Sequence, residues 1–216
     1  MRYSKKDMAM KNPASIVFCF VSFLSLSLPL RGQDGPFLDP ATGRVVYEFE
    51  AEKAVRAAAL INKGAVSAAE ETIADMEDRP EKALLLLTLA GRLDVENSEE
   101  PARQAQSILG HFPENALTMR LADQTAHFLF GLSCFRNRGY SDWYRRTGLG
   151  KRGSVKRLTE ELSKIKPGSP LYDRAQFYIG RMKHGAAMES GRKEEKEDAL
   201  QYLRPLRERY PDHPLL

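Results

Sequence analysis

One segment of this 216-residue chain, residues 136–157, combines cations and aromatic rings in a way that could bind an anionic partner. It reads RNRGYSDWYRRTGLGKRGSVKR and holds eight basic residues against one acidic residue, Asp142. Cations interleaved with aromatic rings bind phosphates and stack on bases or sugars. The alternative is a solvated connection between helices, whose rings pack on a neighbouring helix pair. The candidate partner-binding residues of this segment are Tyr140, Trp143, Arg145 and Arg146.

Patterns typical of catalysis or metal binding are missing from the sequence. The histidines His111, His127, His184 and His213 lie far apart, without the close pairing that metal sites use. No serine stands in a nucleophile-elbow pattern, and the run GLGK at residues 148–151 lacks the spacing of a phosphate-binding loop. We therefore expect no catalytic residue, no metal site, no cofactor and no enzymatic activity.

The N-terminus has the layout of a secretory signal. Basic residues at positions 2, 5, 6 and 11 precede the uncharged, mostly apolar run ASIVFCFVSFLSLSLPL at residues 14–30. We predict a signal peptide over residues 1–32, with an uncleaved signal anchor as the alternative because the run is near the lower length limit for spanning. The expected location is the periplasm or cell envelope, with membrane contact through this segment alone. Residues 33–44, rich in Gly and Pro, are predicted to be a linker or an extended arm.

From residue 45 onwards, apolar residues recur with helical spacing. Ala54, Ala57, Ala58 and Ile61 illustrate the three- and four-residue steps that place side chains on one helix face. No segment alternates with the period of two that strands require, so an all-α fold is predicted. The expected helices span residues 45–62, 66–76, 81–93, 100–109, 114–135, 155–165, 171–183 and 194–209.

Short proline motifs recur between the expected helices. FPENAL at residues 112–117 and YPDHPL at 210–215 share an aromatic residue, Pro, an acid and Leu, and KPGSPL at 166–171 keeps the Pro and the Leu. An alanine stands twelve residues before two of the helix-ending prolines, Ala68 before Pro80 and Ala199 before Pro211. A small residue there, about three turns back, would let two helices approach closely.

These positions resemble the tetratricopeptide repeat, a helix pair of about 34 residues with a Leu-Gly pair, a small residue and a closing proline. Gly180, Ala199 and Pro211 fit those places in the last unit. The resemblance implies stacked antiparallel helix hairpins, an α-solenoid, over residues 45–216. The repeat positions it assigns are Ala68, Pro80, Gly91, Pro113, Gly131, Pro167, Gly180, Ala199 and Pro211.

The spacing departs from the family pattern. The glycine-to-proline separations are 22, 36 and 31 residues, where the family has about 24. Long connections within helix pairs are therefore predicted at residues 137–153 and 185–193. A solenoid needs a polar terminal cap, which Pro214-Leu215-Leu216 does not provide, so we expect the repeats to continue beyond residue 216 or a partner to cover this end.

The resemblance implies a non-enzymatic scaffold of the cell envelope that binds a peptide or protein subunit in a concave helical groove. The expected groove residues are Gln124, His127, Gln176 and Tyr178. The alternatives are a recruiting module of a larger envelope enzyme, or a binder of anionic envelope components through residues 136–157. Nucleic acid is not an expected partner, because 33 basic residues against 29 acidic ones give a net charge of only +4. The sequence does not indicate an oligomeric state.

Overall fold

The computed structural model describes residues 35–93, 97–136, 151–214 and 216, all within one of the chain's two compact units, residues 31–216. These described residues form helices and connections, with one isolated antiparallel bridge between Leu38 and Val45 and no strand. The predicted all-α class is confirmed. The helices are α1 Glu52–Asn62, α2 Val66–Ala74, α3 Pro80–Gly91, α4 Glu99–Gly110, α5 Ala116–Arg136, α7 Lys151–Leu162, α8 Tyr172–Ser190 and α9 Lys193–Arg209.

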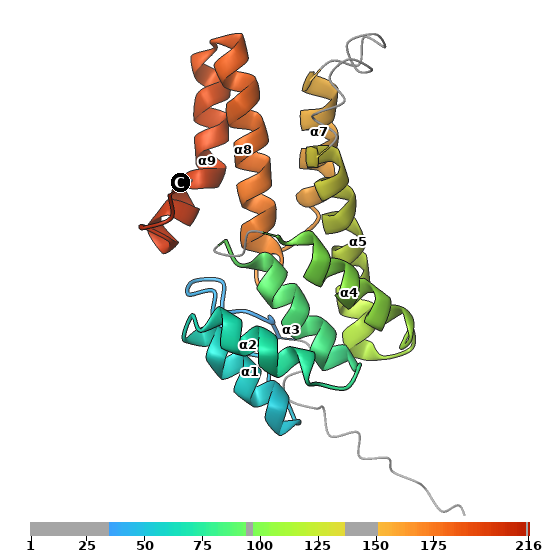
Figure 1. The fold of residues 1–216 in the computed structure, drawn as a ribbon. Helices are drawn as coiled ribbons and strands as arrows, with labels where there is room; N and C mark the ends of the chain where they lie inside the picture. The colour runs from blue at the N-terminus through green and yellow to red at the C-terminus, as the bar shows by residue number, and fades with distance from the viewer. Residues whose placement is uncertain (1–34, 94–96, 137–150, 215) are drawn as a thin grey trace, which may run out of the picture. The chain divides into compact units, whose positions relative to one another are not determined.

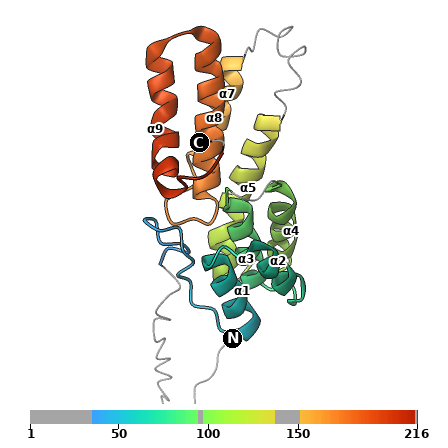
Figure 2. The same cartoon turned by 60° about the vertical axis from the view of Figure 1, so that its left-hand side comes forward.

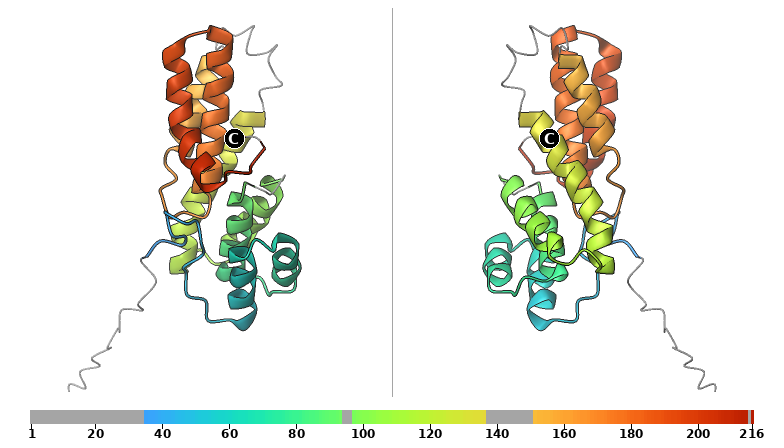
Figure 3. Two further views of the ribbon diagram at one scale, coloured as in Figure 1. Left: turned by 90° about the vertical axis from the view of Figure 1, so that its left-hand side faces the viewer. Right: turned by 90° about the vertical axis from the view of Figure 1, so that its right-hand side faces the viewer.

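The helices pack in pairs along the chain: α1 with α2, α3 with α4, α5 with α7, and α8 with α9 (Figure 1). Figure 3 shows α8 and α9 side by side from two directions. The second helix of a pair also contacts the first helix of the next pair, and the first helices α1, α3, α5 and α8 contact one another in chain order. A further contact, between α3 and α8, joins the second pair to the fourth.

Local sequence explains where several helices begin and end. Pro80 is the first residue of α3, a position where a missing N–H has no cost. The side chain of Asn115 accepts hydrogen bonds from the backbone N–H groups of Leu117 and Thr118 at 2.9 and 3.2 Å, which caps the start of α5. Gly191 ends α8 with a left-handed conformation, φ 71°, that favours glycine.

The core is built around α3. Ten of the twelve residues of this helix are buried, including the run from Ala83 to Gly91, because α1, α2, α4, α5 and α8 all contact it. A helix that is apolar on every face needs such a covering. This places the block ALLLLTLAG of the sequence at the centre of the described fold.

Glycines mark the closest approaches between elements. A Cβ atom on Gly91 would overlap the backbone carbonyl of Pro170, so the end of α3 lies directly against the connection before α8. On Gly131 it would meet Leu162 of α7, and on Gly180 it would meet Leu203 of α9. The expected role of Gly131 and Gly180 as packing positions agrees with these contacts within their own helix pairs.

Residues 35–46 form an arm that packs on the helices, shown in blue beside the connection before α8 in Figure 2. The N–H groups of Phe37 and Leu38 donate to the carbonyl of Gly168 at 3.1 and 3.0 Å. The guanidinium of Arg120 on α5 lies 4.2 Å from the centre of the Phe37 ring and donates to the carbonyl of Gly35.

Three predicted helix boundaries were wrong. The first helix begins at Glu52 rather than residue 45, because residues 45–49 pack as part of the extended segment. α7 begins at Lys151, four residues before the predicted start at residue 155. α8 continues through Gly185 to Ser190, where the buried Ala187 faces the core, so the long connection predicted at residues 185–193 is absent.

The remaining predicted repeat positions differ in how deeply they are buried. Ala199 is fully buried in α9, but Ala68 is exposed and its neighbour Ala69 is the buried small residue of α2. This correction of one position follows from the helix phase, which turns Ala69 and Ile73 towards the core. Pro113, Pro167 and Pro211 are exposed and follow the ends of α4, α7 and α9.

Candidate functional site

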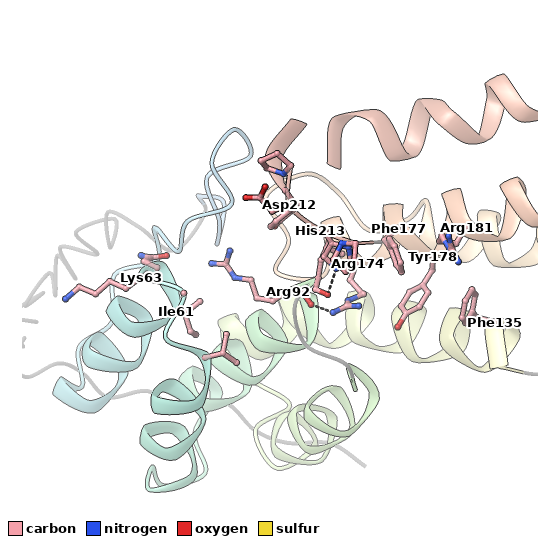
Figure 4. Close-up of a pocket in the computed structure, with 17 residues that line it drawn as sticks. Ile61, Lys63, Arg92, Phe135, Arg174, Phe177, Tyr178, Arg181, Asp212 and His213 are labelled. Atoms are coloured by element: carbon pink, nitrogen blue, oxygen red, sulfur yellow. Dashed lines mark hydrogen bonds between the residues drawn. The ribbon is translucent and has the colours of Figure 1, made fainter. Parts of the chain in front are cut away.

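The candidate site is a pocket of about 1230 Å³ to which every helix pair contributes. We call it the Arg92 pocket, after the residue that follows the end of α3. The ends of α1 and α3, the last residues of α5, one face of α8 and the segment after α9 line it (Figure 4). Its described lining residues are Ile61, Asn62, Lys63, Gly64, Val66, Arg92, Leu93, Phe135, Arg174, Phe177, Tyr178, Arg181, Tyr210, Pro211, Asp212, His213 and Pro214.

Aromatic rings form one side of the Arg92 pocket. The ring of Tyr178 lies 4.7 Å from the ring of Phe135 and 5.8 Å from that of Phe177, measured between centroids. The Tyr178 hydroxyl shares a hydrogen bond of 2.9 Å with the hydroxyl of Ser98, the residue before α4. Because Ser98 is buried, this bond holds the Tyr178 ring in a fixed position.

Cations dominate the charged groups of the Arg92 pocket. Lys63, Arg92, Arg174 and Arg181 line it, against one carboxylate among the described lining residues, Asp212. Arg174 is buried and donates to the backbone carbonyl of Arg92. Lys63 and Arg181 are exposed, so their charges are available at the mouth.

Arg92 carries one of several buried side-chain polar atoms that have no hydrogen-bond partner among the described residues. In Arg92 this atom is Nε of the guanidinium. A buried donor without a partner is costly, by about 1–3 kcal/mol, and such groups are few in folded proteins. In Figure 4 the Arg92 side chain points away from Phe135, Phe177 and Tyr178, whereas Arg174 and Arg181 lie beside these rings, so cations line the pocket along its whole length.

A polar cluster anchors the segment after α9, which forms one wall of the pocket. Asp173 is buried at the start of α8 and accepts hydrogen bonds from Arg209 at 2.5 Å and from the hydroxyl of Tyr210 at 2.8 Å. Burial, together with the neighbouring Asp173 carboxylate, raises the pKa of Tyr210 to about 12. Further along, the ring of His213 lies 2.9 Å from the carbonyl of Leu93 and so closes the wall onto the end of α3.

The expected groove residues are not brought together. Tyr178 lines the Arg92 pocket, whereas Gln124, His127 and Gln176 do not. The His127 ring lies 2.8 Å from Glu161 on α7 and 3.3 Å from Asp123 on its own helix, so it joins two helices. The Gln124 amide donates to the carbonyl of Arg120 within α5. The hydrogen bonds from Lys164 and His127 lower the pKa of Glu161.

The basic and aromatic candidates Tyr140, Trp143, Arg145 and Arg146 lie outside the described residues, as does the apolar run at residues 14–30. Across the residues that are described, no helix has the length and apolar character needed to cross a membrane. Nor do three or more His, Cys, Asp or Glu side chains converge there as metal ligands would. Burial raises the pKa of the half-buried Cys134 thiol, which leaves it in the protonated, unreactive form at neutral pH.

Comparisons of this chain with protein-family models, with curated proteins and with solved structures found no match.

Sequence reasoning identified one residue of the site, Tyr178, and missed the cations Lys63, Arg92 and Arg181. A basic residue just after a helix is ordinarily a solvated group that complements the helix dipole, so position alone gave no signal. One available clue was Arg92 directly after the apolar run that ends in Gly91, where a cation is forced close to a buried contact.

Proposed function

We propose that this protein is a non-enzymatic interaction scaffold of the tetratricopeptide type, which binds a peptide or a segment of a protein in the Arg92 pocket. The observation that carries the proposal is the pocket itself, lined by aromatic and aliphatic side chains and by a few charged groups from all four helix pairs. Its volume of about 1230 Å³ is larger than the roughly 300–1,000 Å³ typical of small-molecule sites, which favours a chain segment.

The packing of the helices supports the same proposal. Successive pairs contact through their first helices and through neighbouring second and first helices, as repeat proteins do. The contact between α3 and α8 is additional, and it brings the fourth pair close to the end of α3 where the pocket lies. A scaffold of this kind binds its partner where several repeats converge. Export to the cell envelope is part of the proposal and rests on residues 14–30 of the sequence.

The test is photo-cross-linking with a library of random octapeptides displayed on phage. A photoreactive side chain would replace the exposed lining residue Lys63 or Arg181 of the full chain, and for comparison the exposed residue Arg56, which does not line the pocket. We expect enriched peptides to be cross-linked from positions 63 and 181 but not from position 56. If no peptide is enriched, or cross-linking is equal from all three positions, the proposed function is wrong.

A further inference from the structure

The guanidinium of Arg92, which lines the pocket, indicates the chemistry of the ligand. Its buried Nε has no hydrogen-bond partner within the described residues. A guanidinium is always charged at neutral pH and presents a planar fork of donors that matches a carboxylate. Because Arg92 lines the pocket, its guanidinium is placed to pair with an anion that enters it.

The other charges of the pocket favour an anion as well. Lys63 and Arg181 are exposed on its lining, and Asp212 is the one described carboxylate there. Arg174 donates to the carbonyl of Arg92 and adds a positive charge beside the rings of Phe177 and Tyr178. This excess of cations in a partly enclosed site raises the local concentration of negative ligands.

The aromatic rings of the pocket favour an apolar group in the same ligand. Phe135, Phe177 and Tyr178 form a contiguous aromatic surface, and Ile61 and Val66 add aliphatic surface. A free inorganic anion would leave this surface uncovered. A ligand that matches both the cations and the rings carries an acidic group and an apolar or aromatic side chain.

We propose that the Arg92 pocket recognises an acidic peptide segment, in which the carboxylate of an Asp or Glu pairs with Arg92 and an aromatic or large aliphatic residue packs on Phe177 and Tyr178. This inference rests on the proposed function and narrows it to one class of segment. Carboxylates are the ordinary anions of a protein partner, so no modification of that partner is required. The exposed cations Lys63 and Arg181 then increase the rate of association more than they fix the bound geometry.

The experiment uses matched peptides. The octapeptides enriched by the full chain are expected to contain Asp or Glu together with an aromatic or large aliphatic residue. The best of them is then synthesised with a fluorescein label, alongside a twin in which Asn or Gln replaces the acidic residue. By fluorescence anisotropy the wild-type chain should bind the acidic peptide about tenfold or more tightly than its amide twin, because a hydrogen-bonded charge pair is lost in the twin.

The variant Arg92→Gln should reduce this preference to a ratio near one, whereas the control Arg56→Gln, on the exposed face of α1, should leave it unchanged. Arg92→Lys, which keeps the charge but loses the planar fork, should give an intermediate ratio. Urea unfolding of each variant checks that the fold is kept. If Arg92→Gln fails to fold, the affinity ratio of Arg92→Lys is used instead. A ratio below that of the wild-type chain supports the inference, and an unchanged ratio contradicts it.

The outcomes separate the two proposals. Peptides that bind the pocket without preference for the acidic form, or with a preference that survives Arg92→Gln, would overturn the acidic-segment inference and leave the proposed function standing. A phosphorylated twin bound more tightly than the acidic peptide would also overturn it. The absence of any enriched peptide would overturn both.

Discussion

The second and fourth helix pairs are built on the same plan but are held in place by different forces. Ten of the twelve residues of α3 are buried, whereas α9 has seventeen residues and buries two, Ala199 and Leu206. The lower end of the fourth pair is fixed instead by the polar cluster of Asp173, Arg209 and Tyr210. Apolar burial therefore dominates at the centre of the fold, and hydrogen bonds to a buried carboxylate dominate at the end next to the pocket.

This contrast predicts that truncating a core leucine costs most in α3. Leu87→Ala should lower the free energy of unfolding by about 4 kcal/mol, because Leu87 is fully buried and its loss leaves a cavity among five packed helices. Leu200→Ala, at a half-buried position of α9, should lower it by about 1 kcal/mol. Urea denaturation followed by circular dichroism measures both, and equal losses would contradict the comparison.

The next largest effect is expected at Gly91. Gly91→Ala should destabilise the protein by about 3 kcal/mol, since the new methyl group would overlap the backbone of Pro170 and backbone cannot rotate away. Gly110→Ala is the matched control, because Gly110 also ends a helix but nothing lies within 4 Å of its added Cβ. The control should be neutral or slightly stabilising, owing to the higher helix propensity of alanine.

The polar cluster should make the fourth pair sensitive to alkaline pH. The pKa of Tyr210 is raised to about 12 from an ordinary value of 10. The folded state therefore holds this proton more tightly, so its contribution to stability is full below pH 10 and is lost as the pH rises towards 12. The expected loss is about 2 kcal/mol. It is measured by urea unfolding at each pH, as the difference in the free energy of unfolding between the wild-type chain and Tyr210→Phe. A difference that does not change between pH 9 and pH 12 would refute this role.

The smallest effect is predicted at Gly180. Gly180→Ala should cost about 1 kcal/mol, because the added methyl would meet the end of the Leu203 side chain, which can move, rather than backbone. Comparison of its midpoint of thermal unfolding with that of Gly91→Ala sharpens the contrast between the two pairs. A larger loss of stability at Gly180 than at Gly91 would contradict the expectation that backbone yields less to an added methyl group than a side chain does.

Much of the fold could be predicted from the residue pattern, because helices depend on local information. The apolar spacing and the Gly and Pro punctuation gave the helices and most of their ends within a few residues. The errors have physical causes: α8 continues through Gly185 to the buried Ala187, and residues 45–49 do not belong to α1 because Val45, Tyr47 and Phe49 pack against the core. Tertiary contact outweighed local preference in both places.

The candidate site was much harder to predict. Tyr178 was identified on its helix, but His127, expected in the groove, joins α5 to α7 through Glu161. Arg92 was not predicted to be a site residue, because nothing near it in sequence shows that its guanidinium will line a pocket. The residues around it come from positions as distant as Lys63 and His213, and only the packing of α8 against α3 brings them together.

The sequence by itself determined the all-α class and most of the helix ends, since these depend on spacing over a few turns. The tertiary structure decided the contact between α3 and α8, the buried cluster around Asp173 and the Arg92 pocket. Each of these joins residues more than thirty positions apart, and their approach depends on the packing of whole helices rather than on any local pattern.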